Sequence, residues 1–390
     1  MKILIVGGTG CLSSAVTTEA IRNGIHVTMV NRGNRMNLIP QEVTLIKSDK
    51  NEFNRIAQAL KGQIFDAVMD FLCYSDYEVF QSFNFYSKYA RQYFFISSCA
   101  VYDTTKSDLC EEDSPKGLAI WDYSLSKWAS EQKLLTLSSN SNTKVTIIRP
   151  CVTYGDTRIP YGISPKYGYH WTMVARILAG KPIITWNGGM NRCNMTRVED
   201  FAVGVVGLVG NPKAYGEAFN VCGDETPSFK EVLDSVSSFL QKEVKTVDVS
   251  SEFYAKEIPL RAGELLGGRS IDAINSNKKI CEAVPGFRQS IKLQEGVAIT
   301  LKAYQSQHYQ HGIDWDFDGD CDRVIRKWCK KKNIDVSSMN LGFVDYLHNA
   351  STKDLLIYWK AAHFNRFYYK MRRILGIMKR KIQSSRILFI

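Results

Sequence analysis

The sequence predicts an α/β fold built around a doubly wound parallel sheet. Short apolar runs that suit buried strands alternate with longer segments of helical periodicity in the first part of the chain. The first run is followed at once by a glycine-rich turn and then by a helical segment. Repeated alternation of this kind is typical of a parallel sheet with helices on both faces.

The expected elements follow in order along the chain. Six strands are expected at residues 2–6, 26–30, 43–47, 65–70, 93–97 and 145–149. The clearest helices are expected at 12–23, 51–61, 78–89 and 124–138. Pro150 closes the sixth strand, and a later helix at 227–241 would belong to a smaller lobe.

A glycine-rich turn, Gly7-Gly-Thr-Gly10, stands between the first strand and the first helix. Backbone amides at the helix N-terminus would face a pyrophosphate, and the glycines would let it approach closely. Ser13 occupies the third small position of the usual pattern and is small enough for helix–strand packing. The turn predicts a Rossmann-type domain that binds a dinucleotide through Gly7, Gly8, Thr9, Gly10, Cys11 and Leu12.

The ends of the next two strands bear on which dinucleotide is bound. An NAD site usually has an acidic residue after the second strand, where it holds the ribose hydroxyls. This chain has Asn31 there, and Arg32 could pair with a 2′-phosphate, which slightly favours NADP over NAD. Asp49, after the third strand, could reach the adenine edge, although a loop aspartate is more often a turn former.

A tyrosine and a lysine are spaced for acid–base chemistry. Tyr123 stands four residues before Lys127 in an expected helix, which places both side chains on one face. The ammonium would stabilise the phenolate, because a nearby positive charge favours the ionised form. Ser98, after the fifth strand, could hydrogen-bond the same substrate oxygen. Alone, each residue would more often pack in a helix or end a strand, but together they predict a general acid/base for alcohol–ketone interconversion.

In this order the motifs resemble the extended short-chain dehydrogenase/reductase superfamily, in particular its nucleotide-sugar epimerase/dehydratase family. The resemblance rests on the glycine turn, the Tyr123/Lys127 pair and four further segments at 97–102, 149–155, 194–202 and 216–223. It implies a catalytic role for Ser98, Tyr123 and Lys127. It also implies that Pro150 borders the nicotinamide and that Tyr154 and Arg197 contact a nucleotide-sugar substrate, with Arg197 at the diphosphate.

The resemblance also suggests how the chain is divided. We expect a dinucleotide-binding domain at 1–165, with later contributions from about 193–225. A substrate-binding lobe is expected at 166–192 and 226–310, followed by a helical C-terminal extension at 311–390. The stretch from 155 to 182 is rich in aromatic residues, which suit a nucleobase or sugar ring and equally suit a packed core.

Three functions remain open. The main prediction is an NAD(P)-dependent epimerase that acts on a nucleotide-activated sugar through a transient ketone. An NADPH-dependent keto-sugar reductase would use the same residues. A non-catalytic dinucleotide-binding or RNA-binding regulator is permitted by a bulky segment at 70–74, but the intact catalytic set argues against it. Cys99 and Ala100 replace the Asp-Glu pair of the family's dehydratases, which argues against a sugar dehydratase.

A run of alternating carboxylates at 314–322 resembles a calcium-binding loop. Ile325 stands where such a loop requires a bidentate glutamate. The sequence therefore predicts a solvated acidic turn that caps the helix after Asp322, and no metal site.

Composition and charge bound the remaining properties. The ten cysteines form no Cys-x-x-Cys pairs, which indicates a reducing cytosol rather than zinc or disulfides. No run reaches the roughly 18 apolar residues of a membrane span. The net charge of +11 is mostly local, because residues 355–390 hold nine lysines and arginines among apolar side chains and no acidic residue. Such a tail predicts contact with the inner membrane surface, or docking on protein. No nucleic-acid module is recognised, and the resemblance is compatible with a homodimer.

Overall fold

The structure, a computed structural model, describes residues 1–306 and 312–364. These residues form two compact units. The first comprises 1–156, 192–227 and 272–296, and the second comprises the described residues of 157–191, 228–271 and 297–390. Residues 365–390, which hold most of the predicted basic tail, lie outside the described residues.

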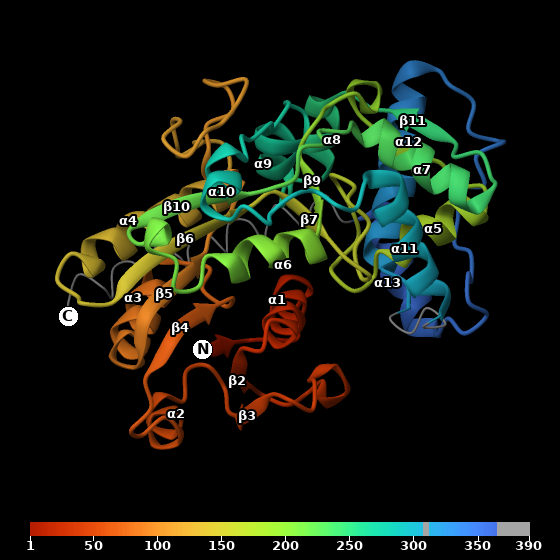
Figure 1. Ribbon diagram of the computed structural model, residues 1–390. Helices are drawn as coiled ribbons and strands as arrows, with labels where there is room; N and C mark the ends of the chain where they lie inside the picture. The colour runs from red at the N-terminus through yellow and green to blue at the C-terminus, as the bar shows by residue number, and fades with distance from the viewer. Residues whose placement is uncertain (307–311, 365–390) are drawn as a thin grey trace, which may run out of the picture. The chain divides into compact units, whose positions relative to one another are not determined.

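The first unit is built on a seven-stranded parallel sheet with the order β10-β6-β5-β4-β1-β2-β3 (Figure 1). Its strands are β1 (Lys2–Val6), β2 (His26–Asn31), β3 (Thr44–Lys47), β4 (Phe65–Asp70), β5 (Ala90–Ile96), β6 (Lys144–Pro150) and β10 (Glu217–Val221). A second parallel pair joins β7 (Val152–Tyr154) to β9 (Met195–Arg197). The chain winds outward from β1 in both directions, so the strand order reverses between β1 and β4, where ligands of such sheets usually bind.

Helices cover both faces of this sheet (Figure 1). One core includes residues of α1 (Cys11–Arg22), α6 (Val198–Gly207) and α10 (Lys278–Ala283). The core on the other face includes residues of α2 (Phe53–Ala59), α3 (Asp76–Tyr86) and α4 (Asp122–Ser138). Strand β1 explains the division, because Ile3 and Ile5 belong to the first core, whereas Leu4 and Val6 belong to the second. Successive side chains of a strand point to opposite faces.

The second unit combines helices with one parallel strand pair. The pair is β8 (Ile183–Thr185) with β11 (Thr246–Asp248). Its helices are α5 (Trp171–Leu178), α7 (Phe229–Leu240), α8 (Ser251–Glu257), α9 (Ala262–Glu264), α12 (Trp315–Lys332) and α13 (Thr352–His363), with a π-helical turn at Leu265–Arg269. Helix α11 (Leu293–Ser306) begins within the first unit and ends in the second. Short 3-10 helices in the chain are Met36–Leu38, Ser87–Tyr89, Cys99–Val101, Asn187–Gly189 and Pro212–Ala214.

The aromatic-rich stretch supplies part of the core of the second unit. Tyr161 is buried, and its ring centroid lies 5.7 Å from those of Trp186 and Phe229. His170 is also buried, and its Nδ1 accepts a hydrogen bond from the Ile159 amide (3.2 Å). Burial lowers the pKa of His170 to about 3, so this ring stays neutral. Both residues therefore act in packing here.

The predicted fold class and all six predicted strands are confirmed. The seventh strand, β10, was not predicted, because Glu217 and Asn220 interrupt its apolar run. In these compact units, residues 272–296 cluster with the sheet, whereas residues 157–165 and the described residues after 311 cluster with the second unit. The functional division into a dinucleotide-binding domain and a substrate-binding lobe stays a prediction. Within the described part of the chain, no helix is long and apolar enough to cross a membrane.

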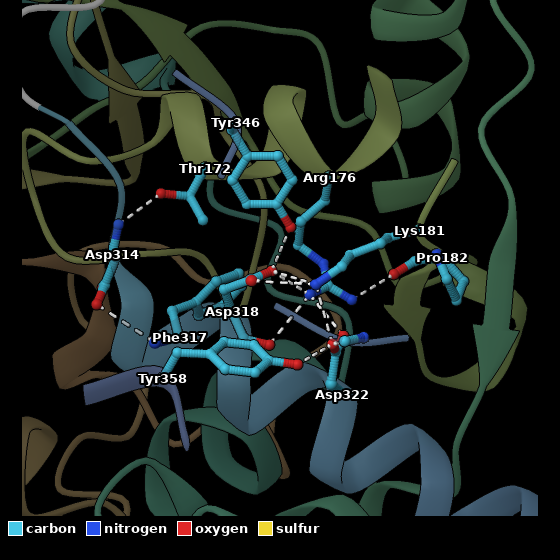
Figure 2. Close-up of polar contacts among 11 residues, drawn as sticks. Thr172, Arg176, Lys181, Pro182, Asp314, Phe317, Asp318, Asp322, Tyr346 and Tyr358 are labelled. Carbon is cyan, nitrogen blue, oxygen red and sulfur yellow. Dashed lines mark hydrogen bonds and ion pairs between the residues drawn. The ribbon is translucent and has the colours of Figure 1, made fainter. Parts of the chain in front are cut away.

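The prediction of a solvated turn at 314–322 was wrong. Helix α12 begins after Asp314, whose side chain accepts a hydrogen bond from the Phe317 amide (3.3 Å). Asp318 and Asp322 lie inside this helix with no exposed surface, and they pair with Arg176 and Lys181 (Figure 2). Buried cations from another segment, invisible to local sequence patterns, hold these carboxylates away from water.

The glycine in the acidic run also has a packing role. A Cβ atom on Gly319 would lie 2.5 Å from the Tyr358 carbonyl oxygen and 2.8 Å from Ala361 Cβ. Helix α13 therefore packs against α12 at a distance that only glycine allows.

Candidate active site

The glycine turn has a backbone that other residues rarely adopt. Gly7 and Gly8 have φ angles of 114° and 91°. A Cβ atom on Gly8 would also lie 2.2 Å from the Met29 side chain. Gly10 precedes α1, and its amide donates to Ser13 Oγ (3.0 Å). Ser13 was predicted only to be small enough for helix–strand packing. Its hydroxyl also accepts a hydrogen bond that fixes the turn at the start of the helix.

The two residues expected to select the dinucleotide differ in their surroundings. The Asn31 amide group donates to the Gly7 carbonyl oxygen (2.5 Å) and to Thr9 Oγ1 (3.3 Å). Its side-chain oxygen accepts from the Gly33 amide (2.9 Å). Asn31 thus ties the end of β2 to the glycine turn, whereas Arg32 is exposed.

Asp49 and Pro150 lie at two other strand ends. The Asp49 carboxylate accepts a hydrogen bond from the Asn51 amide (3.0 Å), as in a simple turn. Pro150 is the buried last residue of β6. Cys11 and Leu12, the first two residues of α1, are half-buried beside the turn.

Lys127 is a buried lysine held by backbone carbonyls. Its ammonium group donates to the carbonyl oxygens of Cys73 and Ile96, both at 2.8 Å, and the residue is only 3% exposed. Ile96 is the last residue of β5, and Cys73 lies three residues after the end of the neighbouring strand β4. Burial lowers the pKa of Lys127 to about 8, although nearby anions oppose the shift. The group is charged at neutral pH but can release its proton at mildly alkaline pH.

The other two predicted catalytic residues occur near the same strand ends. Tyr123 lies in the first turn of α4, one turn before Lys127, and its side chain is 40% exposed. Its ring centroid is 5.6 Å from that of Trp121. Ser98 is half-buried and follows β5, and its Oγ accepts from the Ala100 amide (3.2 Å). Ser98 is two residues beyond the Ile96 carbonyl that holds Lys127, so both belong to one edge of the sheet.

A buried ionic brace fixes α4 to this edge. Glu131, one turn after Lys127, receives two hydrogen bonds from the Arg149 guanidinium at 2.7 and 3.0 Å. Ser97 Oγ donates to the same carboxylate (2.5 Å), and Arg149 also donates to Tyr102 Oη (2.7 Å). Sequence analysis missed this brace. An arginine at the end of an otherwise apolar strand, Val-Thr-Ile-Ile-Arg149, was the signal that could have revealed a buried acidic partner.

Tyr154 and Arg197 are neighbours on the paired strands β7 and β9. The Arg197 guanidinium is fully buried and bonds to Asp156 (2.9 Å) and Glu199 (2.5 Å). It lies 5.7 Å from the Tyr154 ring centroid. Tyr154 is buried as well, and burial raises its pKa. Both carboxylates are about half exposed, so an anionic ligand at Arg197 would compete with two carboxylates that face solvent.

The sheet, the glycine turn and the Tyr123/Lys127 helix together define a dinucleotide-binding protein of the short-chain dehydrogenase/reductase type. Residues 3–222 match the model of the NAD dependent epimerase/dehydratase family. The chain belongs to this family, which confirms the predicted resemblance.

Individual relatives are distant and differ in their described activities. The chain is 29% identical to chloroplast stem-loop binding protein of 41 kDa b of Arabidopsis thaliana, over 58% of this chain and 60% of that protein. It is 19% identical to 2'-dehydrokanamycin reductase of Streptomyces kanamyceticus, over 66% of this chain and 72% of that protein. It is 24% identical to UDP-glucose 4-epimerase of Vibrio cholerae, over 47% of this chain and 53% of that protein. The chain thus matches less than two thirds of the Arabidopsis and Vibrio proteins.

Solved structures share the fold. UDP-glucuronic acid 4-epimerase from Bacillus cereus, in complex with NAD, is 17% identical with a TM-score of 0.61, and the match covers 79% of this chain and all of that one. UDP-glucose 4-epimerase from Thermus thermophilus, also with NAD, is 18% identical with a TM-score of 0.62, over 78% of this chain and 99% of that one.

Proposed function

We propose that the protein is an NAD(P)-dependent epimerase that acts on a nucleotide-activated sugar through a transient ketone. The observation that supports this most directly is the arrangement around Lys127. Its ammonium is bonded to the end of β5 and to the segment that follows β4, and Lys127 lies one helical turn from Tyr123. A fixed positive charge at that place suits a tyrosine that must alternate between phenol and phenolate.

The residues of the glycine turn fit a dinucleotide. Gly8 leaves no room for a side chain beside Met29, so the turn presents bare backbone, and the N-terminus of α1 follows directly. When bound, the nicotinamide would take a hydride from the sugar carbon and return it. Tyr123 would accept the hydroxyl proton and later give it back, and the Lys127 charge would stabilise the phenolate between these steps. The Ser98 hydroxyl would hydrogen-bond the same oxygen.

Two features favour the second candidate, an NADPH-dependent keto-sugar reductase. One relative is a reductase by name. In addition, Arg32 is exposed after β2, where it could meet the 2′-phosphate of NADP. In this case Tyr123 would protonate the alkoxide once, and the oxidised cofactor would leave.

The retained nucleotide distinguishes these candidates. Purified protein is denatured, and any released nucleotide is identified and quantified by mass spectrometry. A near-stoichiometric dinucleotide is expected for an epimerase, which regenerates its cofactor in every cycle. An empty site that binds NADPH better than NADH would favour the reductase instead.

Tyr123→Phe tests whether the protein is an enzyme. Removal of the hydroxyl should lower turnover of UDP-sugars by a factor of about 10² to 10⁴, because general acid–base catalysis supplies factors of this size. Tyr77→Phe, a partly exposed tyrosine of α3, serves as the matched control. Unchanged turnover in Tyr123→Phe would exclude the acid–base role. Absence of any dinucleotide would favour the non-catalytic alternative, to which the Arabidopsis relative's stem-loop binding name corresponds.

We further propose that the C-terminal segment contacts an anionic membrane surface. Leu355, Leu356 and Trp359 are exposed on α13, whereas Tyr358 and Ala361 face inward and are buried. The basic residues of 365–390 follow this helix in the sequence. The intact protein should therefore sediment with vesicles that contain phosphatidylserine and remain free of phosphatidylcholine vesicles. Equal sedimentation with both would refute an electrostatic contact.

A further inference from the structure

The segment at 71–74, which follows β4, is held in place by side chains. Three of its backbone groups bond to side chains of other segments: Lys50 Nζ donates to the Leu72 carbonyl oxygen (2.6 Å), Ser126 Oγ donates to the Tyr74 carbonyl oxygen (2.9 Å), and the Tyr74 amide donates to Glu78 (2.8 Å). Helices α3 and α4 supply two of these. The Cys73 carbonyl accepts from the Lys127 ammonium.

The Asp70 carboxylate accepts hydrogen bonds from this segment. It is the last residue of β4 and is only 2% exposed. One carboxylate oxygen accepts from the Leu72 amide (2.7 Å). The other accepts from Cys73 Sγ (3.1 Å) and Ser82 Oγ (2.5 Å). Burial and the Asp70 charge raise the pKa of the Cys73 thiol, so it remains a donor to the carboxylate.

We infer that Asp70 is a positioning residue for Lys127, which it serves by fixing the Cys73 carbonyl that receives the ammonium. The route is short. Asp70 accepts hydrogen bonds from the amide of residue 72 and the thiol of residue 73, and the carbonyl of the same residue 73 accepts from the Lys127 ammonium. This inference rests on the proposed function, because only a catalytic Lys127 gives its placement a chemical consequence.

The same segment also adjoins the cofactor turn. A Cβ atom on Gly7 would lie 3.4 Å from Leu72 Cγ. The residues that hold Lys127 therefore also pack against the backbone expected to bind the dinucleotide. Asp70 would therefore fix the position of the Lys127 anchor relative to the glycine turn.

The charges around Lys127 make the role of Asp70 measurable. Burial is the largest influence and lowers the pKa of Lys127, whereas the carboxylates of Asp70, Glu131 and Glu78 favour its charged form. The protonated Cys73 thiol contributes a hydrogen bond to Asp70 rather than a charge. The rings of Tyr74 and Phe95 also face the ammonium, at 5.3 and 5.0 Å. Removal of the Asp70 charge should therefore make Lys127 lose its proton at a lower pH.

The test is a titration of Lys127 itself. Protein labelled with ¹³Cε-lysine is titrated by NMR, and the Lys127 signal is assigned by its absence in Lys127→Met. The wild-type midpoint is expected near pH 8, and Asp70→Asn should shift it down by about one unit. Asp66→Asn is the matched control, because Asp66 lies on the same strand but is partly exposed and pairs with Arg91. Its midpoint should equal that of the wild type.

Two cysteine variants separate the hydrogen-bond route from the charge. Cys73→Ser retains a donor to Asp70 and should keep the wild-type midpoint. Cys73→Ala loses that donor and should shift the midpoint in the same direction as Asp70→Asn, by a smaller amount. An unchanged midpoint in Cys73→Ala would overturn the inference, because a shift in Asp70→Asn alone would report only the loss of its charge. Cys73→Ala therefore decides the matter, also where Asp70→Asn does not fold. The titration needs no substrate, so its failure is distinguishable from a failure of the proposed enzyme activity.

Discussion

The two units each bury a lysine, and the partners of these lysines differ. Lys127, in the first unit, is 3% exposed and bonds to two backbone carbonyls. Lys181, in the second, has no exposed surface and bonds to the carboxylates of Asp318 (3.1 Å) and Asp322 (2.9 Å). Arg176 shares both of these carboxylates, so two cations meet two anions (Figure 2).

These different partners make the surroundings of Lys127 suited to chemistry and those of Lys181 suited to a structural role. Carbonyl dipoles compensate a buried ammonium only in part, which is why the pKa of Lys127 falls to about 8. In the second unit, burial raises the pKa of Asp322, but Arg176 and Lys181 outweigh burial and leave it below the ordinary value. Tyr346 and Tyr358 add hydroxyl donors to the same carboxylates, at 2.8 and 2.6 Å. The charge of the partners, rather than burial alone, distinguishes the two lysines.

Replacement of Lys127 should have the largest effect on activity. Lys127→Met should reduce turnover of UDP-sugars by a factor of about 10² to 10⁴, because Tyr123 loses the charge that stabilises its phenolate. Thermal melting should show a folded protein, since the variant removes a buried charge that has no carboxylate bonded to it in the described structure. Full turnover in a folded Lys127→Met variant would show that Lys127, like Lys181, has no role in the chemistry.

Replacement of Lys181 should instead affect stability. Lys181→Met leaves Asp318 and Asp322 with one cation fewer, and loss of one partner of a buried pair costs about 3–5 kcal/mol. Lys230→Met is the control, because Lys230 pairs with Asp234 (2.7 Å) and both side chains are more than half exposed. An exposed pair contributes about 1 kcal/mol or less. Urea unfolding measures both free energies, and equal losses would contradict the structural role of the buried network.

The pH dependence of stability provides a third test. The folded-state pKa of Lys127, about 8, lies below its ordinary value of 10.5. Between these values the unfolded chain holds a proton that the folded chain has released, so stability rises with pH. The wild type should gain on the order of 3 kcal/mol relative to Lys127→Met between pH 8 and 10.5. Urea unfolding at these two pH values measures the difference, and a constant difference would mean that Lys127 titrates normally.

Local patterns in the sequence were sufficient for the fold and for placing Tyr123 and Lys127 on one helix, while the catalytic role of this pair stays a prediction. Tyr123 and Lys127 share a helix, so their spacing in the sequence predicts that their side chains lie on one face. The strands are predicted from their short apolar runs. Lys181 and Arg176 are far in sequence from Asp318 and Asp322, and nothing near the acidic run indicates buried cations. The Glu131–Arg149 brace was missed for the same reason. Pairings over long sequence distances depend on the fold, and a single sequence does not contain them.

The smallest effect is expected at an exposed charge, which extends the comparison to a third environment. Arg32 is exposed after β2, so water already solvates its guanidinium, and a contact with a 2′-phosphate would add little net free energy. Arg32→Ala should therefore weaken NADPH binding by about 5-fold, equivalent to about 1 kcal/mol. NADH binding should not change, and calorimetric titration with both nucleotides measures the ratio. Arg35→Ala is the control, since Arg35 is also exposed and lies three residues further along the same loop. An equal loss for NADPH and NADH would show that Arg32 contacts a part common to both nucleotides. No loss for either would place the NADP preference, if one is measured, at another residue.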